Sequence, residues 1–257
     1  MKLDGTCVVV TGAAGGIGEA LARRFVSEGA RTVVVSDVQA AALENTAARL
    51  GAVAMPCDVT DAPAVDALVA DVEQAHGPID LFCSNAGVAI PGAAGAPAEA
   101  WKVSLDVNLM AHVHAANALV PRMVDRGSGY LLQTASAAGL LTQLGSAPYA
   151  VSKHAAVAFA EFLSITYGDR GLKVSVLAPQ GVRTAMTAGS RNGGVAGVDG
   201  MIEPDDVADA AVRGLDEEHF LILPHPQVLE YFRRKADDYD RWLQGMRRLQ
   251  QRYTDPI

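Results

Sequence analysis

The 257-residue sequence predicts an α/β protein built on a doubly wound parallel sheet of seven strands, with helices on both faces. Two observations carry this prediction. Apolar, β-branched runs of strand length alternate with amphipathic patterns of helical period along the chain. Glycine or small polar residues follow most of these runs, as expected where parallel strands end at a ligand-binding edge.

Composition predicts one domain and argues against several classes of function. Half of the residues are hydrophobic and 19% are charged, which suits a single domain over residues 1–257. The net charge of −8 argues against nucleic acid as a partner. No apolar run reaches the roughly 18 to 20 residues that span a bilayer, and a strand pattern starts close to Met1. We therefore expect no membrane insertion, no signal peptide and a cytoplasmic protein.

The three cysteines give no sign of a disulfide framework. Cys7, Cys57 and Cys83 lie far apart, each within an apolar run. This pattern predicts buried free thiols in a reducing compartment and no metal site.

A glycine-rich turn follows the first predicted strand, residues 6–10, and a helical pattern continues from Glu19. Gly12 permits a tight turn, Gly16 lets the backbone approach a pyrophosphate, and Gly18 lets the helix pack close to the strand. The helix N-terminus offers N–H groups and a positive dipole end to the anion. The order of strand, turn and helix is typical of a Rossmann-type dinucleotide-binding domain.

The second predicted strand, residues 31–36, ends at Asp37, which lies 19 residues after Gly18. An acid at about 20 residues is expected to hydrogen-bond the adenosine ribose. A carboxylate there repels a 2′-phosphate, and no lysine or arginine follows before Arg49. The sequence therefore predicts NAD as the cofactor.

Later elements alternate in the same way. Strands are predicted over 51–57, 79–83, 130–134, 173–178 and 220–223, and helices over 39–50, 101–124 and 149–167, with two more from Thr60 and Glu203. Asp58, Asn85, Ser136 and Thr184 follow four of these strands. We expect these polar residues to share one sheet edge with the glycine-rich turn.

Tyr149 and Lys153 are four residues apart on a predicted helix and therefore face the same side. A phenol has a pKa near ~10, and a nearby positive charge lowers that pKa. Such a tyrosine can exchange a proton with an alcohol near neutral pH. Ser136, at a strand end, could bring a hydroxyl beside the phenol. Alone, this spacing is also typical of an exposed surface pair.

In combination, these motifs resemble the short-chain dehydrogenase/reductase family, in its common single-domain form, over about residues 3–223. The motifs are Thr11-Gly12-x-x-x-Gly16-Ile17-Gly18, Asp58-Val59, Asn85-Ala86-Gly87, Asn108, Ser136, Tyr149-x-x-x-Lys153 and the segment after Pro179. The resemblance implies that Tyr149 is the general acid/base and that Ser136 binds the substrate oxygen. It implies that Lys153 lowers the pKa of Tyr149 and holds the nicotinamide ribose. It also implies that Asn108 holds a water for proton relay.

The resemblance further implies a set of cofactor-binding residues. They are Gly12, Gly16, Ile17, Gly18, Asp37, Asp58, Val59, Asn85, Ala86, Gly87, Tyr149, Lys153, Val182 and Thr184. One position departs from the family pattern, since Gln180 takes the place of the usual glycine and Gly181 follows it. This leaves the local backbone and its effect on specificity open. Because the family commonly forms tetramers or dimers, the resemblance implies a homotetramer or homodimer.

The substrate side is less regular. Residues 185–203 are glycine-rich and predict a mobile lid, with a plain loop as the alternative. The expected pocket segments, 88–97 and 137–143, are mostly apolar, which favours a neutral, lipophilic secondary alcohol or ketone. Arg183 and Arg191 leave an acidic substrate group open.

Residues 227–253 predict a C-terminal amphipathic helix. It could cover its own substrate pocket, cover a neighbouring subunit, or pack passively on its own domain.

We therefore expect an NAD-dependent enzyme that interconverts a secondary alcohol and a ketone by hydride transfer. Two alternatives remain, an NADP-dependent ketone reductase and a catalytically silent dinucleotide-binding sensor or scaffold. A silent protein would explain the glycine-rich turn and Asp37. It would give no reason for the joint presence of Asn108, Ser136, Tyr149 and Lys153.

Overall fold

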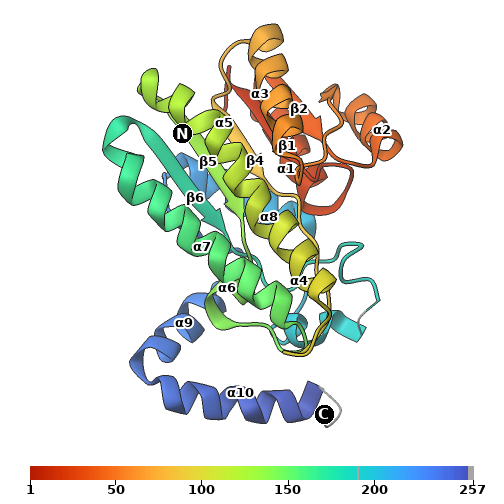
Figure 1. The fold of residues 1–257 in the computed structure, drawn as a ribbon, viewed down its shortest axis with the longest axis vertical. Helices are drawn as coiled ribbons and strands as arrows, with labels where there is room; N and C mark the ends of the chain where they lie inside the picture. The colour runs from red at the N-terminus through yellow and green to blue at the C-terminus, as the bar shows by residue number, and fades with distance from the viewer. Residues whose placement is uncertain (190, 254–257) are drawn as a thin grey trace.

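The computed structural model describes residues 1–189 and 191–253. Its parallel strands form one seven-stranded sheet in the order β3-β2-β1-β4-β5-β6-β7, with helices on both faces (Figure 1), which confirms the predicted fold class. The strands are β1 (Cys7–Thr11), β2 (Thr32–Ser36), β3 (Val53–Ala54), β4 (Leu81–Ser84), β5 (Gly129–Thr134), β6 (Leu172–Leu177) and β7 (Leu221–Ile222).

Two apolar layers enclose the sheet, because successive side chains of each strand face opposite sides. Val9 packs with helices α3, α5 and α7, whereas Val8 and Val10 pack with α1, α2 and α8. The helices are α1 (Gly16–Ser27), α2 (Ala40–Leu50), α3 (Ala62–His76), α4 (Ala98–Leu105), α5 (Ala111–Asp125), α6 (Ala138–Leu141), α7 (Ala147–Tyr167), α8 (Pro204–Asp216), α9 (Gln227–Asp237) and α10 (Tyr239–Tyr253). None of the described helices is long and apolar enough to cross a membrane.

The strand register brings the predicted site residues to one edge. Thr11 pairs with Ser36, so Gly12 and Asp37 leave adjacent strands at the same level. Ser84 pairs with Gln133 farther along, which places the start of the Asn85 turn beside the end of β5. The carboxyl ends of the strands therefore form one continuous edge.

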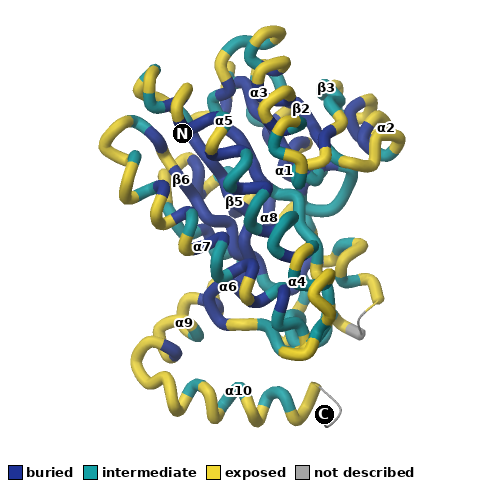
Figure 2. The backbone as a smooth tube through the Cα atoms, viewed as in Figure 1, coloured by how far each residue is buried: buried dark blue, intermediate teal, exposed yellow. Residues whose placement is uncertain are grey.

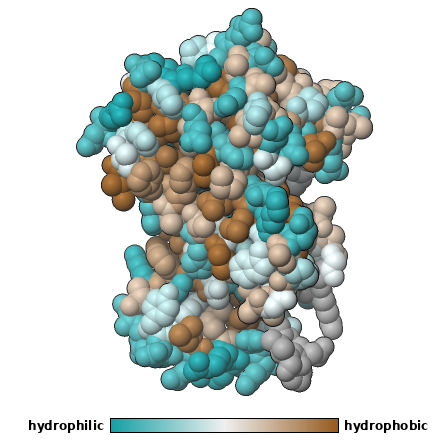
Figure 3. Space-filling view, viewed as in Figure 1, coloured by the Kyte–Doolittle hydropathy of each residue, from teal (hydrophilic) through white to brown (hydrophobic). Residues whose placement is uncertain are grey.

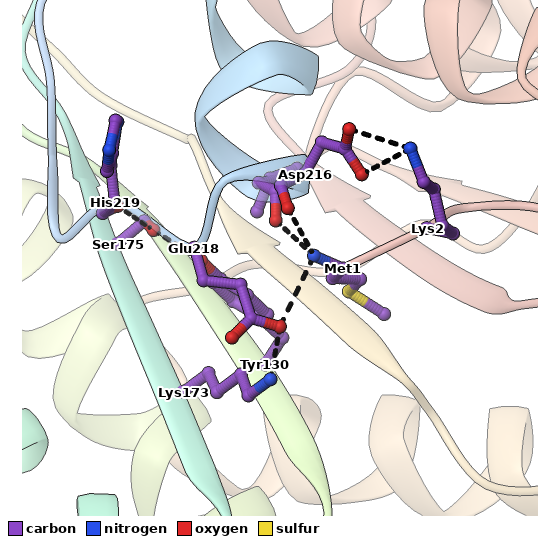
Figure 4. A network of polar contacts seen from close by, with 9 residues as sticks. Met1, Lys2, Tyr130, Lys173, Ser175, Asp216, Glu218 and His219 are labelled. Atoms are coloured by element: carbon purple, nitrogen blue, oxygen red, sulfur yellow. Dashed lines mark hydrogen bonds and ion pairs between the residues drawn. The ribbon is translucent and has the colours of Figure 1, made fainter.

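The opposite edge is closed by polar contacts that fasten the N-terminus (Figure 4). The amino group of Met1 donates to the carbonyl of Leu215, and Lys2 pairs with Asp216 at 2.7 Å. Between the strands, the hydroxyls of Tyr130 and Ser175 lie 2.7 Å apart. These contacts close the amino ends of the strands and leave the carboxyl ends open.

The single long helix expected over residues 101–124 differs from the structure. A five-residue π-helical segment, η1 (Asp106–Met110), separates α4 from α5. Such wide turns are frequent at functional sites. Here the segment contains Asn108, whose side chain is fully buried.

The C-terminal helix is also interrupted, at Asp238, whose backbone is extended (φ −152°, ψ 95°). The segment predicted as one helix over residues 227–253 is therefore two helices, α9 and α10. Val228 and Lys235 of α9 are buried, whereas no residue from 239 to 253 is buried. Figures 1 and 2 show α10 at the periphery, with exposed and partly exposed residues along its length.

The segment expected as a lid forms a loop whose base is closed by a bridge between Val182 and Ile202. Within the loop, Arg191–Gly197 contains short helical turns that are interrupted at Asn192, Gly193 and Gly194, whose backbone angles are not helical. Ser190 lies outside the described residues.

Candidate active site

The glycine-rich turn between β1 and α1 is shaped by close backbone contacts. Gly12 has φ +65°, and a Cβ there would lie 2.7 Å from the Cα of Ala86. A Cβ on Gly18 would lie 2.2 Å from the carbonyl oxygen of Gly12. The Asn85 side-chain amide donates to the carbonyl of Thr11 at 3.1 Å, which joins the ends of β1 and β4. Larger side chains at Gly12 or Gly18 would displace this backbone.

Asp37 is held at the end of β2 by two backbone donors. Its Oδ2 accepts from the N–H of Ala14 at 3.1 Å, and its Oδ1 accepts from the N–H of Gln39 at 3.0 Å. A carboxylate has about four acceptor positions. Asp37 therefore keeps acceptor capacity for a further ligand.

All fourteen residues expected to bind a cofactor line one cavity of about 570 Å³, called here the first cavity. It runs along the carboxyl ends of the strands, from Asp37 and Asp58 past the glycine-rich turn to Tyr149 and Lys153. Asp58 accepts from the hydroxyl and N–H of Thr60, and these contacts lower the pKa of its carboxyl. Among the described residues that line the cavity, Lys153 alone is basic.

The groups that line the first cavity suit a dinucleotide. A Cβ on Gly15 would meet nothing within 4 Å, so the turn faces open space beside the helix N-terminus. Backbone N–H groups there are suited to a pyrophosphate. Asp37 offers acceptors to ribose hydroxyls at one end, and Lys153 offers a donor at the other.

Lys153 is buried at the inner end of the first cavity. Its Nζ donates to the carbonyl of Thr134 at 2.8 Å and lies 5.9 Å from the centroid of the Tyr149 ring. Burial lowers the pKa of Lys153 from its ordinary 10.5 to about 8. The ammonium is therefore the main form at neutral pH.

Tyr149 does not show the lowered pKa that was expected. Burial is the largest influence and raises the pKa of its phenol, while a hydrogen bond with Ser136 opposes this rise. The Lys153 ammonium lies over the face of the ring. The effect of Lys153 on the Tyr149 pKa stays a prediction.

Ser136 is the third member of this group and follows β5. Its Oγ accepts from the N–H of Ala138 at 3.1 Å and donates to the carbonyl of Pro179 at 3.4 Å. These contacts fix the hydroxyl next to the phenol of Tyr149. The three side chains can together bind an alcohol oxygen and take its proton.

Asn108 lies behind Lys153, and its amide is largely occupied by protein groups. Its Oδ1 accepts from the N–H of Val88 at 2.9 Å, and its Nδ2 donates to the carbonyl of Val88 and to the hydroxyl of Ser152. Both donors are used, and one acceptor position remains. These contacts hold the loop after β4 against α7.

His112, one helical turn after Asn108, is a buried group for which we predicted no role from the sequence. Burial lowers the pKa of its imidazole to about 3, so it is neutral. Neither ring nitrogen has a hydrogen-bond partner among the described residues. His112 lines a cavity of about 10 Å³, about the room that one water needs. Its four-residue spacing from Asn108 could have drawn attention to it.

A second cavity of about 670 Å³ adjoins the first. Ser136 and Gln180 line both, so the two cavities meet at the reacting group. Its lining residues are Ser136, Ala137, Ala138, Leu141, Thr142, Gln143, Gln180, Val195, Ala196, Val198, Tyr231, Arg234, Asp237, Asp238, Arg241, Trp242, Gly245, Met246, Arg248 and Leu249.

Gln180 needs no glycine-like backbone, since it is not among the residues with positive φ. Its N–H donates to Nδ1 of His225 at 3.1 Å, and its Oε1 is buried with no partner among the described residues. Arg183, considered above for an acidic substrate, pairs with Glu203 at 2.7 Å and does not line the second cavity. The side chain of Arg191 lies outside the described part of the structure.

Comparison with known proteins identifies a family. The sequence profile of the family described as short chain dehydrogenase matches residues 6–193. The 1-deoxy-11-beta-hydroxypentalenate dehydrogenases of Streptomyces exfoliatus and Streptomyces avermitilis are 38% and 41% identical, covering 93% and 86% of this chain and 90% and 85% of their own. The crystal structure of a short chain dehydrogenase/reductase from Burkholderia phymatum in complex with NAD superimposes with a TM-score of 0.82 at 28% identity, covering 100% of this chain and 99% of that one.

Proposed function

The chain belongs to the short-chain dehydrogenase/reductase family of oxidoreductases, and we propose that it oxidises a secondary alcohol to a ketone with NAD as hydride acceptor. The observation that carries this proposal is the group formed by Ser136, Tyr149 and Lys153 at the junction of the two cavities. The alcohol lies in the second cavity with its oxygen at this group. The dinucleotide lies in the first cavity.

The protein residues act on the alcohol oxygen. When the alcohol binds, the Ser136 hydroxyl turns from the carbonyl of Pro179, 3.4 Å away, and donates its hydrogen bond to the alcohol oxygen, where it stabilises the negative charge that develops. Tyr149 takes the hydroxyl proton as general base, and the Lys153 ammonium stabilises the resulting phenolate. NAD, when bound, supplies the acceptor for the hydride that leaves the carbinol carbon. The products are the ketone, NADH and one proton.

NAD is preferred over NADP in this proposal because of charge. Asp37 faces the first cavity, where a 2′-phosphate would meet its carboxylate. Apart from Lys153 at the far end, no described basic residue lines that cavity to offset the repulsion. The Burkholderia phymatum structure, which holds NAD, supports the same choice.

The substrate is proposed to have a lipophilic skeleton. Ala137, Ala138, Leu141 and Val195 line the second cavity near Ser136, and a skeleton there is removed from water. The Streptomyces relatives are named for a substrate that carries a hydroxyl group, which supports an alcohol. The sequence favoured a neutral substrate. Arginines line the opposite side of this cavity, however, and they affect which substrate charge it would accept.

We include self-association in the proposal. Val151, Phe162 and Ile165 on α7 are 49%, 57% and 84% exposed, an apolar surface that a homodimer or homotetramer would cover. A cytoplasmic location is the expectation that accompanies it. Light scattering of the purified chain tests the assembly, and a monomer at micromolar concentration would contradict it.

Tyr149→Phe tests the chemistry. The variant keeps the ring but has no proton acceptor, so alcohol oxidation should fall by about 10³-fold or more. NADH affinity should stay within about twofold, because the ring still lines the first cavity. Unchanged turnover would overturn the proposed mechanism. Absence of turnover in the unmodified protein across alcohols and ketones, with NADH bound, would favour a silent sensor.

A further inference from the structure

The second cavity has two unlike sides. Ser136 and the apolar residues of α6 form the side next to the reacting group, while α9 and α10 form the side opposite. The residues of α10 that line it form one helical face: Arg241, Trp242, Gly245, Met246, Arg248 and Leu249. A ligand in this cavity thus meets an apolar face that carries two guanidinium groups.

The net charge of α10 is positive, whereas that of the whole chain is negative. The helix contains four arginines and one aspartate, whereas the whole chain has a net charge of −8. The surface at the bottom of Figure 3, where α10 lies, is mostly hydrophilic. Because no residue from 239 to 253 is buried, packing does not explain this composition.

Arg241 and Arg248 have no ion pair with any described residue, although the third arginine of the cavity, Arg234, pairs with Glu230. Asp237 and Asp238 line the cavity where α9 meets α10. Arg241 is three residues from Asp238, so these acids partly compensate its charge. Arg248 lies ten residues from Asp238, about 15 Å along a helix, and is the less compensated of the two.

The opposite side of the cavity is held in place by α9. The buried Nζ of Lys235 donates to the carbonyl of Leu140 in α6 at 2.6 Å and lies 5.4 Å from the centroid of the Tyr239 ring. The hydroxyl of Tyr231 donates to Asp199 at 2.8 Å. Contacts to both α6 and the loop of residues 183–201 therefore set where α10 begins. The second cavity is therefore formed by specific contacts of α9 with the rest of the domain.

We propose that the second cavity takes a secondary alcohol with a lipophilic skeleton and one carboxylate, and that Arg248, assisted by Arg241, binds that carboxylate. Arg234 is already paired with Glu230, and Asp237 and Asp238 lie close to Arg241, so Arg248 is the lining guanidinium that is left to bind one carboxylate. A guanidinium binds a carboxylate through two parallel hydrogen bonds. The proposal rests on the proposed function for the alcohol, and it replaces the expected neutral substrate with an acidic one.

A binding experiment without turnover separates this proposal from the proposed reaction. Trp242 lines the cavity, and its fluorescence reports occupancy. Adamantane-1-carboxylate and adamantane-1-carboxamide are titrated into the full chain, with and without NAD, as probes of equal shape and different charge. The carboxylate should bind about tenfold tighter than the amide.

Arg248→Gln should remove the preference for the carboxylate, and Arg241→Gln should reduce it by about threefold. Arg248→Lys should retain part of it, because the charge remains and the paired hydrogen bonds do not. Arg247→Gln is the matched control, since Arg247 is on the same helix and does not line the cavity. NADH titration confirms that each variant is folded at the first cavity.

Equal affinity for the acid and the amide in the unmodified protein would overturn the proposal. An equal loss in Arg247→Gln would also overturn it, because the effect would then come from the general charge of α10. Neither result touches the proposed dehydrogenase reaction, which is tested by NADH binding and Tyr149→Phe.

Discussion

The two cavities meet at Ser136 and Gln180 but are built in different ways. The first cavity lies on strand ends and a turn whose backbone is fixed by buried contacts, such as Gly18 against Gly12. The second is formed on one side by α10, none of whose residues is buried. The cofactor side is thus closely packed and set by local sequence, whereas the substrate side depends on how separate helices pack.

The largest expected effect on stability and NADH affinity comes from adding a side chain where two backbone segments touch at the first cavity. Gly12→Ala would place a Cβ 2.7 Å from the Cα of Ala86 at φ +65°. We expect the free energy of unfolding to fall by about 2–4 kcal/mol and NADH affinity to fall by about 100-fold or more. Urea denaturation and NADH titration measure both.

Gly15→Ala is the matched control, because a Cβ there meets nothing within 4 Å. It should change stability by less than about 1 kcal/mol. Equal effects of the two substitutions would show that the turn is not set by backbone contact.

The next effect uses pH to compare a buried and an exposed charge. The folded state releases the Lys153 proton near pH 8, and the unfolded chain near 10.5. Below pH 8 both states are protonated, and burial of the charge destabilises the fold in full. Between pH 8 and 10 the folded state loses the charge first, so the penalty falls. Relative to Lys153→Met, the free energy of unfolding of the unmodified protein should rise by up to about 3 kcal/mol.

Arg248→Gln provides the contrast on the second cavity, because the Arg248 side chain is exposed to solvent whereas Lys153 is buried. Its stability difference from the unmodified protein should not change between pH 8 and 10, as urea denaturation at each pH will show. A rise equal to that for Lys153 would contradict the contrast between the cavities.

The smallest effect on the fold is expected from removing α10. A chain that ends after Asp237 should lose less than about 1 kcal/mol of stability, because no residue from 239 to 253 is buried and Trp242 is only partly buried against the core. NADH affinity should stay within about twofold, while the KM for the alcohol should rise by about tenfold. A comparable loss of NADH affinity would mean that the two cavities are not independent.

The parts predicted from the sequence are those set by local contacts. The glycine-rich turn, Asp37 and the Tyr149–Lys153 pair are each recognisable within a few residues, and parallel strand order then brings them together. The resemblance to the family added a cofactor-binding role for Asn85 and Thr184. Their contributions to binding and catalysis remain proposals that the experiments above test.

The features that the sequence did not reveal depend on packing between elements that lie far apart in the chain. The π-helical segment at Asn108 spans only five residues, which is too short a stretch for the spacing of apolar residues to reveal a change of helix type. The break at Asp238 lies between two amphipathic patterns that read as one helix. The acidic substrate group was considered through Arg183, but that side chain pairs with Glu203. Arg241 and Arg248 reach the cavity only because α9 and α10 fold back over α6.

The most direct test of the central claim is a fluorescence titration of the purified protein with NADH and, separately, with NADPH. If Asp37 binds the adenosine ribose in the first cavity, NADH should bind at least about tenfold tighter. Asp37→Ala should narrow the difference. Tighter binding of NADPH, or binding of neither, would contradict the assignment of NAD to this cavity.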